Sequence, residues 1–150
     1  GYFVGQLMDW GKMNSLFLFM TCIAGLFSIE NPPLTIRISA IEKLKGEIKI
    51  SVFNNGTNFL KKGAALKNYS IKVDKYTAII TITDLPKGEY AISMYHDENS
   101  DNQLNRNFIG FPKEPYGFSN NVEPKFGPPK YKDCKFIFSE SKTLNIKMIN

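Results

Sequence analysis

The sequence contains few of the residues from which zinc centres and disulfide frameworks are built. Its 150 residues include one histidine, His96, and two cysteines, Cys22 and Cys134. Cys22 lies in an apolar N-terminal segment that we expect to be removed, which leaves Cys134 as the lone thiol of the mature chain. One histidine and one cysteine do not supply the usual ligands of a zinc site, and one cysteine cannot form an internal disulfide. We therefore expect neither.

The sequence also lacks an apolar stretch long enough for a typical transmembrane helix. The segment LFLFMTCIAGLFSI, residues 16–29, is shorter than the roughly 18 to 20 residues that span a bilayer. Its length and the small residues Gly25 and Ser28 are typical of a secretory signal peptide. We predict that residues 1–29 comprise an upstream segment plus this signal peptide, and that the mature chain begins between Gly25 and Glu30. The protein would then be exported to the periplasm, cell surface or extracellular space without a membrane span. The alternative is a buried or membrane-anchoring N-terminal helix.

A dense run of basic residues is missing as well. The formal net charge is +5, but two residues are arginines and the lysines are spread along the chain. Proteins that bind nucleic acids usually carry a basic stripe or a recognisable reader motif. We expect a solvated basic surface and no nucleic-acid partner.

A sustained helical period is absent after residue 33, and alternation of apolar and polar residues takes its place. The apolar side chains of LTIRISA, residues 34–40, fall on alternate positions, and GEIKISVFN repeats the pattern. Similar segments follow at YSIKV, TAIITIT, GEYAISMYH, CKFIFS and TLNIKMI, the first two joined as a hairpin by Asp74 and Lys75. Short alternating strands predict an all-β fold: an antiparallel Greek-key β-sandwich of about seven strands, forming a single domain over residues 34–149.

The alternation also predicts which side chains point inward. One apolar face of each strand should contribute to a common core, because side chains on a strand alternate between its two faces. The expected core residues are Ile48, Ile50, Val52, Ile80, Ile82, Phe136, Phe138, Leu144 and Ile146.

Residues 96–131 interrupt the strand pattern, and the connection from Gly110 to Lys130 is rich in proline and aromatic residues. Five prolines lie between residues 110 and 130, interleaved with Phe111, Tyr116, Phe118 and Phe126. A connection this long without regular structure is uncommon in a compact domain and is usually functional or disordered. Prolines and aromatic side chains favour order, so we predict one long, ordered loop. Two roles stay open for it: a plug over the end of the sandwich, or a binding surface.

Four segments carry a family resemblance: GEIKISVFN, TDLPKGEYAISMYHDEN, FIGFPKEPYGFSNN and FGPPKYKDCKF. They are similar to an uncharacterised bacterial family, domain of unknown function 2141, over a stretch from about Leu34 to Met148. The resemblance implies an exported protein with a transthyretin-like or immunoglobulin-like sandwich, and it implies no activity, cofactor or partner. The chain departs from the family pattern at Asn105, where many members have aspartate, and at Cys134, where a small residue such as alanine is usual. The first departure weakens a cation site, and the second suits a buried position.

The polar stretch that begins at His96 has the spacing of a calcium loop. Oxygen-bearing side chains occupy alternate positions, as the first ligands of an EF-hand loop do. These candidate metal ligands are Asp97, Asn99, Asp101 and Asn105. Phe108 stands where that loop has its bidentate carboxylate, so a calcium ion would need Glu98, Glu114 or another loop to complete its shell. The alternative is that the side chains cap backbone N–H groups of their own turn.

The same stretch offers weak candidates for catalysis. His96 beside Asp97 supplies a base and a group to orient it, and Glu114 adds a second carboxylate. No serine lies in a G-x-S-x-G elbow, so a nucleophile is not identified. We expect a protein that is not an enzyme, and we keep a hydrolase that uses His96, Asp97 and Glu114 as the alternative.

These observations lead to a hypothesis of function. We expect an exported, non-enzymatic β-sandwich that presents residues 96–131 as a binding or assembly surface, either without a cofactor or with weakly bound calcium. The partner would be a protein or glycan at the cell envelope. A structural subunit that adds its first or last strand to a partner's sheet is a further alternative. The expected surface residues are Phe111, Glu114, Tyr116, Phe118 and Asn120.

Overall fold

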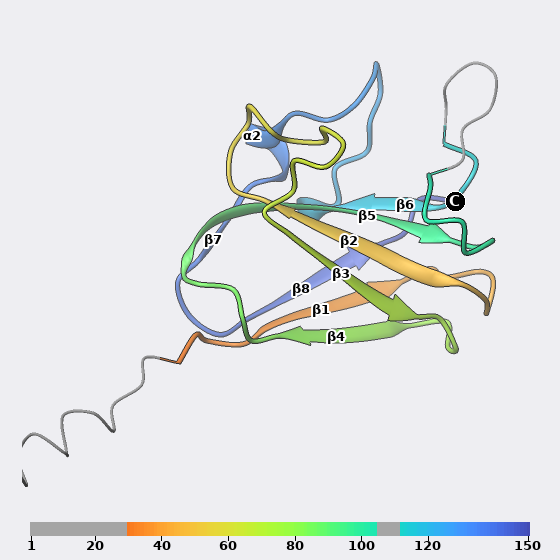
Figure 1. Ribbon diagram of the computed structural model, residues 1–150, viewed down its shortest axis with the longest axis horizontal. Coiled ribbons are helices and arrows are strands. Elements are labelled where there is room, and N and C mark those ends of the chain that lie inside the picture. The colour runs from red at the N-terminus through yellow and green to blue at the C-terminus, as the bar shows by residue number, and fades with distance from the viewer. Residues whose placement is uncertain (1–29, 105–111) are drawn as a thin grey trace, which may run out of the picture. The chain divides into compact units, whose positions relative to one another are not determined.

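The computed structural model describes residues 30–104 and 112–150, and Asn31–Asn150 form one compact unit. Within these residues eight strands form two sheets, accompanied by one 3-10 turn and one short helix (Figure 1). The predicted all-β class is confirmed. The expected signal segment, Asn105 and Phe111 lie outside the described residues. The helices of the described part are too short or too polar to cross a bilayer.

The strands lie where the sequence alternates, with one addition. Their bounds are β1 (Leu34–Ser39), β2 (Glu47–Phe53), β3 (Lys67–Lys72), β4 (Ala78–Ile82), β5 (Gly88–Asp97), β6 (Tyr116–Phe118), β7 (Phe136–Phe138) and β8 (Lys142–Lys147). The helical elements are η1 (Ser119–Asn121) and α2 (Tyr131–Cys134). Strand β6 is the addition, because its segment was expected to be part of the long loop.

The smaller sheet has the strand order β4-β1-β8. Strand β1 pairs antiparallel with β4 and parallel with β8, so that Thr35 lies opposite both Thr81 and Thr143. The prediction of a purely antiparallel sandwich is therefore wrong at this pair. A parallel pair needs a long crossover connection, and here everything from β2 to β7 provides it. Local alternation carries no information about such a distant pairing.

The larger sheet has the order β3-β2-β5-β6, and β7 pairs with the first part of β5. Strands β3 and β4 belong to different sheets, so the predicted hairpin between them is wrong. The chain instead crosses from one sheet to the other between them. Val73 begins this crossing: its side chain is buried, and its N–H donates to the Gly46 carbonyl at 3.1 Å.

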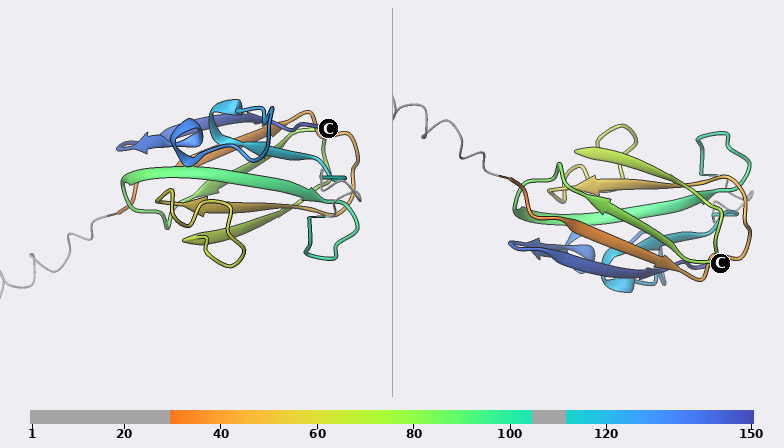
Figure 2. Two further views of the ribbon diagram at one scale, coloured as in Figure 1. Left: turned by 90° about the horizontal axis from the view of Figure 1, so that it is seen from above. Right: turned by 90° about the horizontal axis from the view of Figure 1, so that it is seen from below.

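The two sheets face each other across one apolar core (Figure 2). Seven of the nine predicted core residues are buried, and the other two, Ile80 and Leu144, pack against the buried cluster from partly exposed positions. The predicted core is confirmed. A smaller cluster of Ala91, Phe118 and Cys134 lies outside this main core.

The prediction of one long loop without regular structure between Gly110 and Lys130 is wrong, because β6 and η1 lie within that stretch and α2 directly follows it. A buried hydroxyl group holds these elements together. The Ser119 Oγ accepts a hydrogen bond from the Ile92 N–H at 2.9 Å and donates one to the Cys134 carbonyl. It thereby ties η1 to β5 and to α2.

Candidate functional site

A self-capped turn follows β5. The Asp97 carboxylate is fully buried and accepts hydrogen bonds from the backbone N–H groups of Asp101 at 3.2 Å and Asn102 at 2.8 Å. The Asp101 side chain in turn accepts from the Gln103 N–H at 2.9 Å. Ser100 and Asn102 have left-handed backbone geometry, with φ of 57° and 60°. The predicted turn, in which acidic and amide side chains point at backbone N–H groups, is confirmed.

A second chain segment brings Glu114 to this turn. The His96 N–H donates to the Pro115 carbonyl at 2.8 Å, which fixes the segment before β6 beside the end of β5. Glu114 is buried, and its carboxylate accepts from the Glu98 N–H at 2.8 Å. One carboxylate oxygen from each of Asp97, Asp101 and Glu114 lies within 4.8 Å of the other two. We call these three residues the carboxylate cluster.

The negative charge of the carboxylate cluster affects the pKa of a neighbouring tyrosine, Tyr95. Burial raises the pKa of Tyr95, and the charges of Asp97, Glu114 and Asp101 raise it further. Like charges at such short separation repel one another, and part of the cluster is screened from water. A divalent cation among the three oxygens would relieve this repulsion, and an all-oxygen donor set suits calcium or magnesium more than zinc.

His96 does not join the carboxylate cluster. It is adjacent to Asp97 in a strand, so the two side chains point to opposite faces of the sheet. The imidazole is buried, and its Nε2–H donates to the Lys45 carbonyl at 2.6 Å. Of the three catalytic candidates, the structure therefore brings together Asp97 and Glu114 and separates them from the only histidine of the chain.

The thiol of Cys134 is buried and forms no disulfide. Burial, with a smaller effect from the negative charge of Asp133, raises its pKa to about 11. Because the thiolate is the nucleophilic form, this geometry gives an inert thiol. The expectation of a small buried residue at this position is confirmed, although Cys134 ends α2 and does not lie in a strand.

We accordingly expect Cys134 to resist thiol reagents in the folded protein. At about pH 8 a disulfide reagent should modify it only slowly, since little thiolate forms there, and rapidly once guanidinium has unfolded the chain. The measurement is thiol release with time, and a Cys134→Ala variant separates this residue from Cys22. Equal rates in folded and unfolded protein would contradict the buried, protonated thiol.

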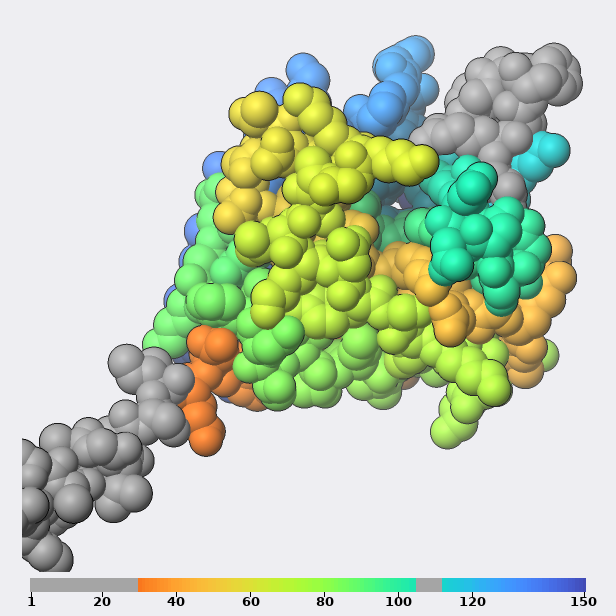
Figure 3. All heavy atoms as spheres, viewed as in Figure 1, coloured from red at the N-terminus to blue at the C-terminus, as the bar shows by residue number. Residues whose placement is uncertain are grey.

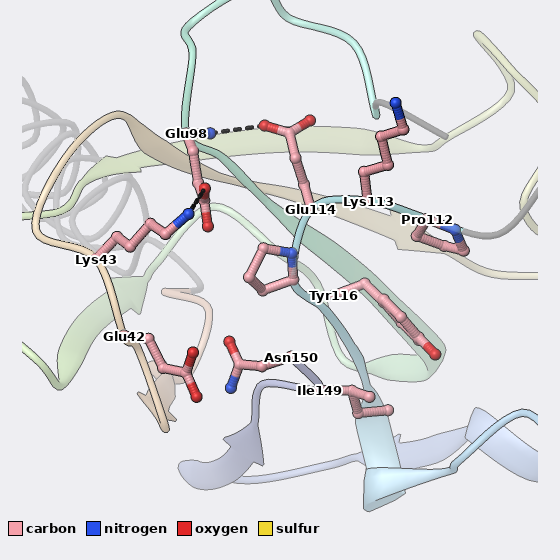
Figure 4. A pocket seen from close by; sticks show the side chains of 10 residues that line it. Glu42, Lys43, Glu98, Pro112, Lys113, Glu114, Tyr116, Ile149 and Asn150 are labelled. Carbon is pink, nitrogen blue, oxygen red and sulfur yellow. Dashed lines mark hydrogen bonds and ion pairs between the residues drawn. The ribbon is translucent and has the colours of Figure 1, made fainter. Parts of the chain in front are cut away.

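A pocket of about 290 Å³ opens beside the carboxylate cluster. Glu114 lines it together with Tyr116, Asn150 and the ion pair between Lys43 Nζ and Glu98 Oε2, whose atoms are 3.2 Å apart (Figure 4). The pocket thus mixes both signs of charge with one aromatic ring. No sequence pattern points to Lys43 or Asn150, because the fold alone brings these distant positions to the segment before β6.

The remaining expected surface residues have structural contacts. Phe118 is buried and its ring packs against Tyr116 with centroids 5.9 Å apart, so it is not on an exposed surface. The Asn120 side-chain amide donates to the carbonyl groups of Asp133 and Lys135. Of the expected surface, Glu114 and Tyr116 remain beside a pocket.

Comparison with known proteins identifies a family. The sequence model of a family described as an uncharacterized protein conserved in bacteria (DUF2141) matches residues 36–147. This range runs from within β1 to the end of β8 and includes both segments that form the carboxylate cluster. No curated protein and no solved structure matches the chain.

Proposed function

This chain belongs to the DUF2141 family of uncharacterised bacterial proteins, and we propose that it is an exported, non-enzymatic binding domain whose surface beside β5 is organised by a calcium ion. The observation that carries the proposal is the convergence of Asp97, Asp101 and Glu114, whose oxygens lie within 4.8 Å of one another. Calcium takes six to eight oxygen ligands in a flexible arrangement, and waters complete a shell that the protein fills only in part.

The donor atoms fit such a cation. A carboxylate has about four lone-pair positions, so Asp97 can accept its two backbone hydrogen bonds and still face a cation. Glu114 supplies the carboxylate that the local loop lacks at Phe108. The ion would then link the turn after β5 to the segment before β6. It would also fix one wall of the neighbouring pocket, where a protein or glycan of the cell envelope would bind.

Export and the type of sandwich are supported by separate observations. The apolar segment at residues 16–29 supports export. Two facing sheets support a sandwich of the transthyretin-like or immunoglobulin-like kind, with a Greek-key connection. The hydrolase alternative receives less support, since His96 faces away from Asp97.

Addition of the first or last strand to a partner's sheet receives less support as well. Strand β1 has a neighbour on each side. The outer edge of β8 is engaged by Asn121, whose side chain accepts from the Lys147 N–H at 2.8 Å and donates to the Asn145 carbonyl at 3.0 Å. A partner strand at β8 would have to displace both bonds.

Calcium should raise the melting temperature of the protein. With a dissociation constant of about a tenth of the free calcium concentration, binding to the folded state adds roughly 1.4 kcal/mol. For a domain of this size that corresponds to a shift of about 3 to 6 °C. Thermal unfolding followed by circular dichroism, with millimolar calcium or with chelator, measures it.

Two variants make this experiment specific. Glu114→Gln removes a charge but keeps an oxygen that accepts from the Glu98 N–H, so it should fold and lose the calcium response. Asp74→Asn removes an exposed carboxylate elsewhere and should respond as the wild type does. A wild-type melting temperature that neither calcium nor chelator moves would sink the cation proposal and leave a self-capped turn.

A further inference from the structure

Two loops pack together at the end of the larger sheet that lies away from the carboxylate cluster. They are residues 54–66, which follow β2, and residues 122–135, which follow η1. Aromatic contact joins them: the rings of Phe59 and Tyr131 have centroids 5.8 Å apart. The register of β2 and β5 places Phe53 opposite Ala91, whereas Asp97 lies opposite Glu47 at the other end of the pair. We call these two loops the basic end.

The basic end concentrates the positive charge of the protein. Its loops carry six lysines, all exposed, and two acidic residues, a formal charge of 6 − 2 = +4 against +5 for the whole chain. The lysines are Lys61, Lys62, Lys125, Lys130, Lys132 and Lys135, and the acids are Glu123 and Asp133. Of these lysines, Lys135 pairs with Glu89 at 3.3 Å. The fold thus brings six of the 19 basic residues of the chain to one end, with few acidic residues among them.

An exposed aromatic ring projects from the same end. The side chain of Phe126 has a relative exposure of 104%, the highest among the exposed large apolar residues of the described chain. It lies between Lys125 and Lys130, in a segment that projects from the rest of the molecule between η1 and α2 (Figure 3). Pro124, Pro128 and Pro129 restrict the backbone on both sides of it. The chain therefore holds an apolar ring in water, on a segment that carries lysines on both sides of it in the sequence.

We propose that the basic end docks the protein on anionic lipid membranes, with Phe126 entering the interface and the lysines of the two loops binding the lipid headgroups. This combination of an aromatic side chain and a lysine cluster is the chemistry of peripheral membrane attachment. The segment that carries Phe126 projects from the domain, so its ring can insert into the headgroup region of a bilayer. Single-stranded nucleic acid fits less well, since it is bound by several aromatic rings along a groove and Phe126 is the one fully exposed ring of the two loops.

Co-sedimentation with lipid vesicles tests this proposal. The protein should bind vesicles that contain about a third anionic lipid, and the binding should weaken as the salt concentration rises. It should not bind vesicles of neutral phosphatidylcholine. Phe126→Ala should weaken binding about tenfold, because the ring no longer leaves water. Its melting temperature should stay that of the wild type, since the ring packs on nothing in the folded domain.

Tyr76→Ala is the matched control. Tyr76 is 63% exposed and follows Lys75, but it lies between β3 and β4, outside the basic end. This variant should bind anionic vesicles as the wild type does. Failure to bind anionic vesicles, equal binding to neutral ones, or undiminished binding by Phe126→Ala would each overturn the proposal. Phe126-dependent binding to a single-stranded oligonucleotide at the same salt, tighter than to vesicles, would also overturn it.

Discussion

Gly46→Ala is expected to destabilise the domain by more than about 3 kcal/mol, because the new methyl group meets backbone that cannot move away. Gly46 has a φ of 65°, in the left-handed region that L side chains rarely adopt. A Cβ atom there would overlap the Asp97 carbonyl oxygen and lie 3.0 Å from the Glu98 Cα. Both contacts are to main chain at the end of β5, directly before the self-capped turn.

Gly63→Ala provides the control for this result. Gly63 has a similar φ of 74°, but a Cβ atom added there meets nothing within 4 Å. It should therefore cost only the backbone strain, about 1 kcal/mol. Urea unfolding of the two variants beside the wild type measures the difference. Equal losses for both would show that the approach of Gly46 to β5 is not as close as described.

Phe138→Ala should cost about 3 to 5 kcal/mol, the usual loss when a fully buried aromatic side chain is deleted from a core. Phe138 has no exposed surface and packs with Tyr90, whose ring centroid is 6.5 Å away. The neighbouring Ile137 points to the other face of β7 and is 62% exposed. Ile137→Ala should therefore change stability by less than about 0.5 kcal/mol. Similar losses of stability at both positions would mean that Phe138 does not pack in the core as described.

The strands and their inward faces were predictable because period-two alternation is a local property. Ile48 and Ile50 point inward for the same reason that Lys49 does not, and neither fact depends on which strand lies alongside. Pairing is different. The sequences of β3 and β4 are compatible with a hairpin, and only the need to cover both sheets with apolar faces sends them to separate layers.

Strand β6 escaped prediction because three residues are too few to show a period. The segment Tyr116–Phe118 pairs with β5 and contains a glycine at its centre, which lets it lie close to β8: a Cβ atom on Gly117 would lie 3.1 Å from Ile146. The buried hydrogen bonds of Ser119 to Ile92 and Cys134 also hold this segment beside β5, and no local sequence pattern predicts them.

In the candidate site, too, the local contacts were predictable from the sequence and the contacts that depend on strand pairing were not. The self-capped turn was predictable from the spacing of Asp97, Asn99 and Asp101, because those contacts span a few residues. The arrival of Glu114 depends on the pairing of its segment with β5. The separation of His96 from Asp97 was implicit in the sequence, since adjacent residues of one strand face opposite ways.

The parallel pairing of β1 with β8 has a consequence for the order in which the domain is completed. Thr35 and Thr143 are paired across 143 − 35 = 108 positions of the chain, so this contact forms only after almost the whole domain has been synthesised. Until then one edge of β1 has no partner, and Leu34, Ile36 and Ile38 lack part of their cover. Contacts between such distant positions are slow to form, and a chain waiting for its last strand stays unfolded longer. A chain of this design closes its smaller sheet only when β8, at the far end of the domain's sequence, has been made.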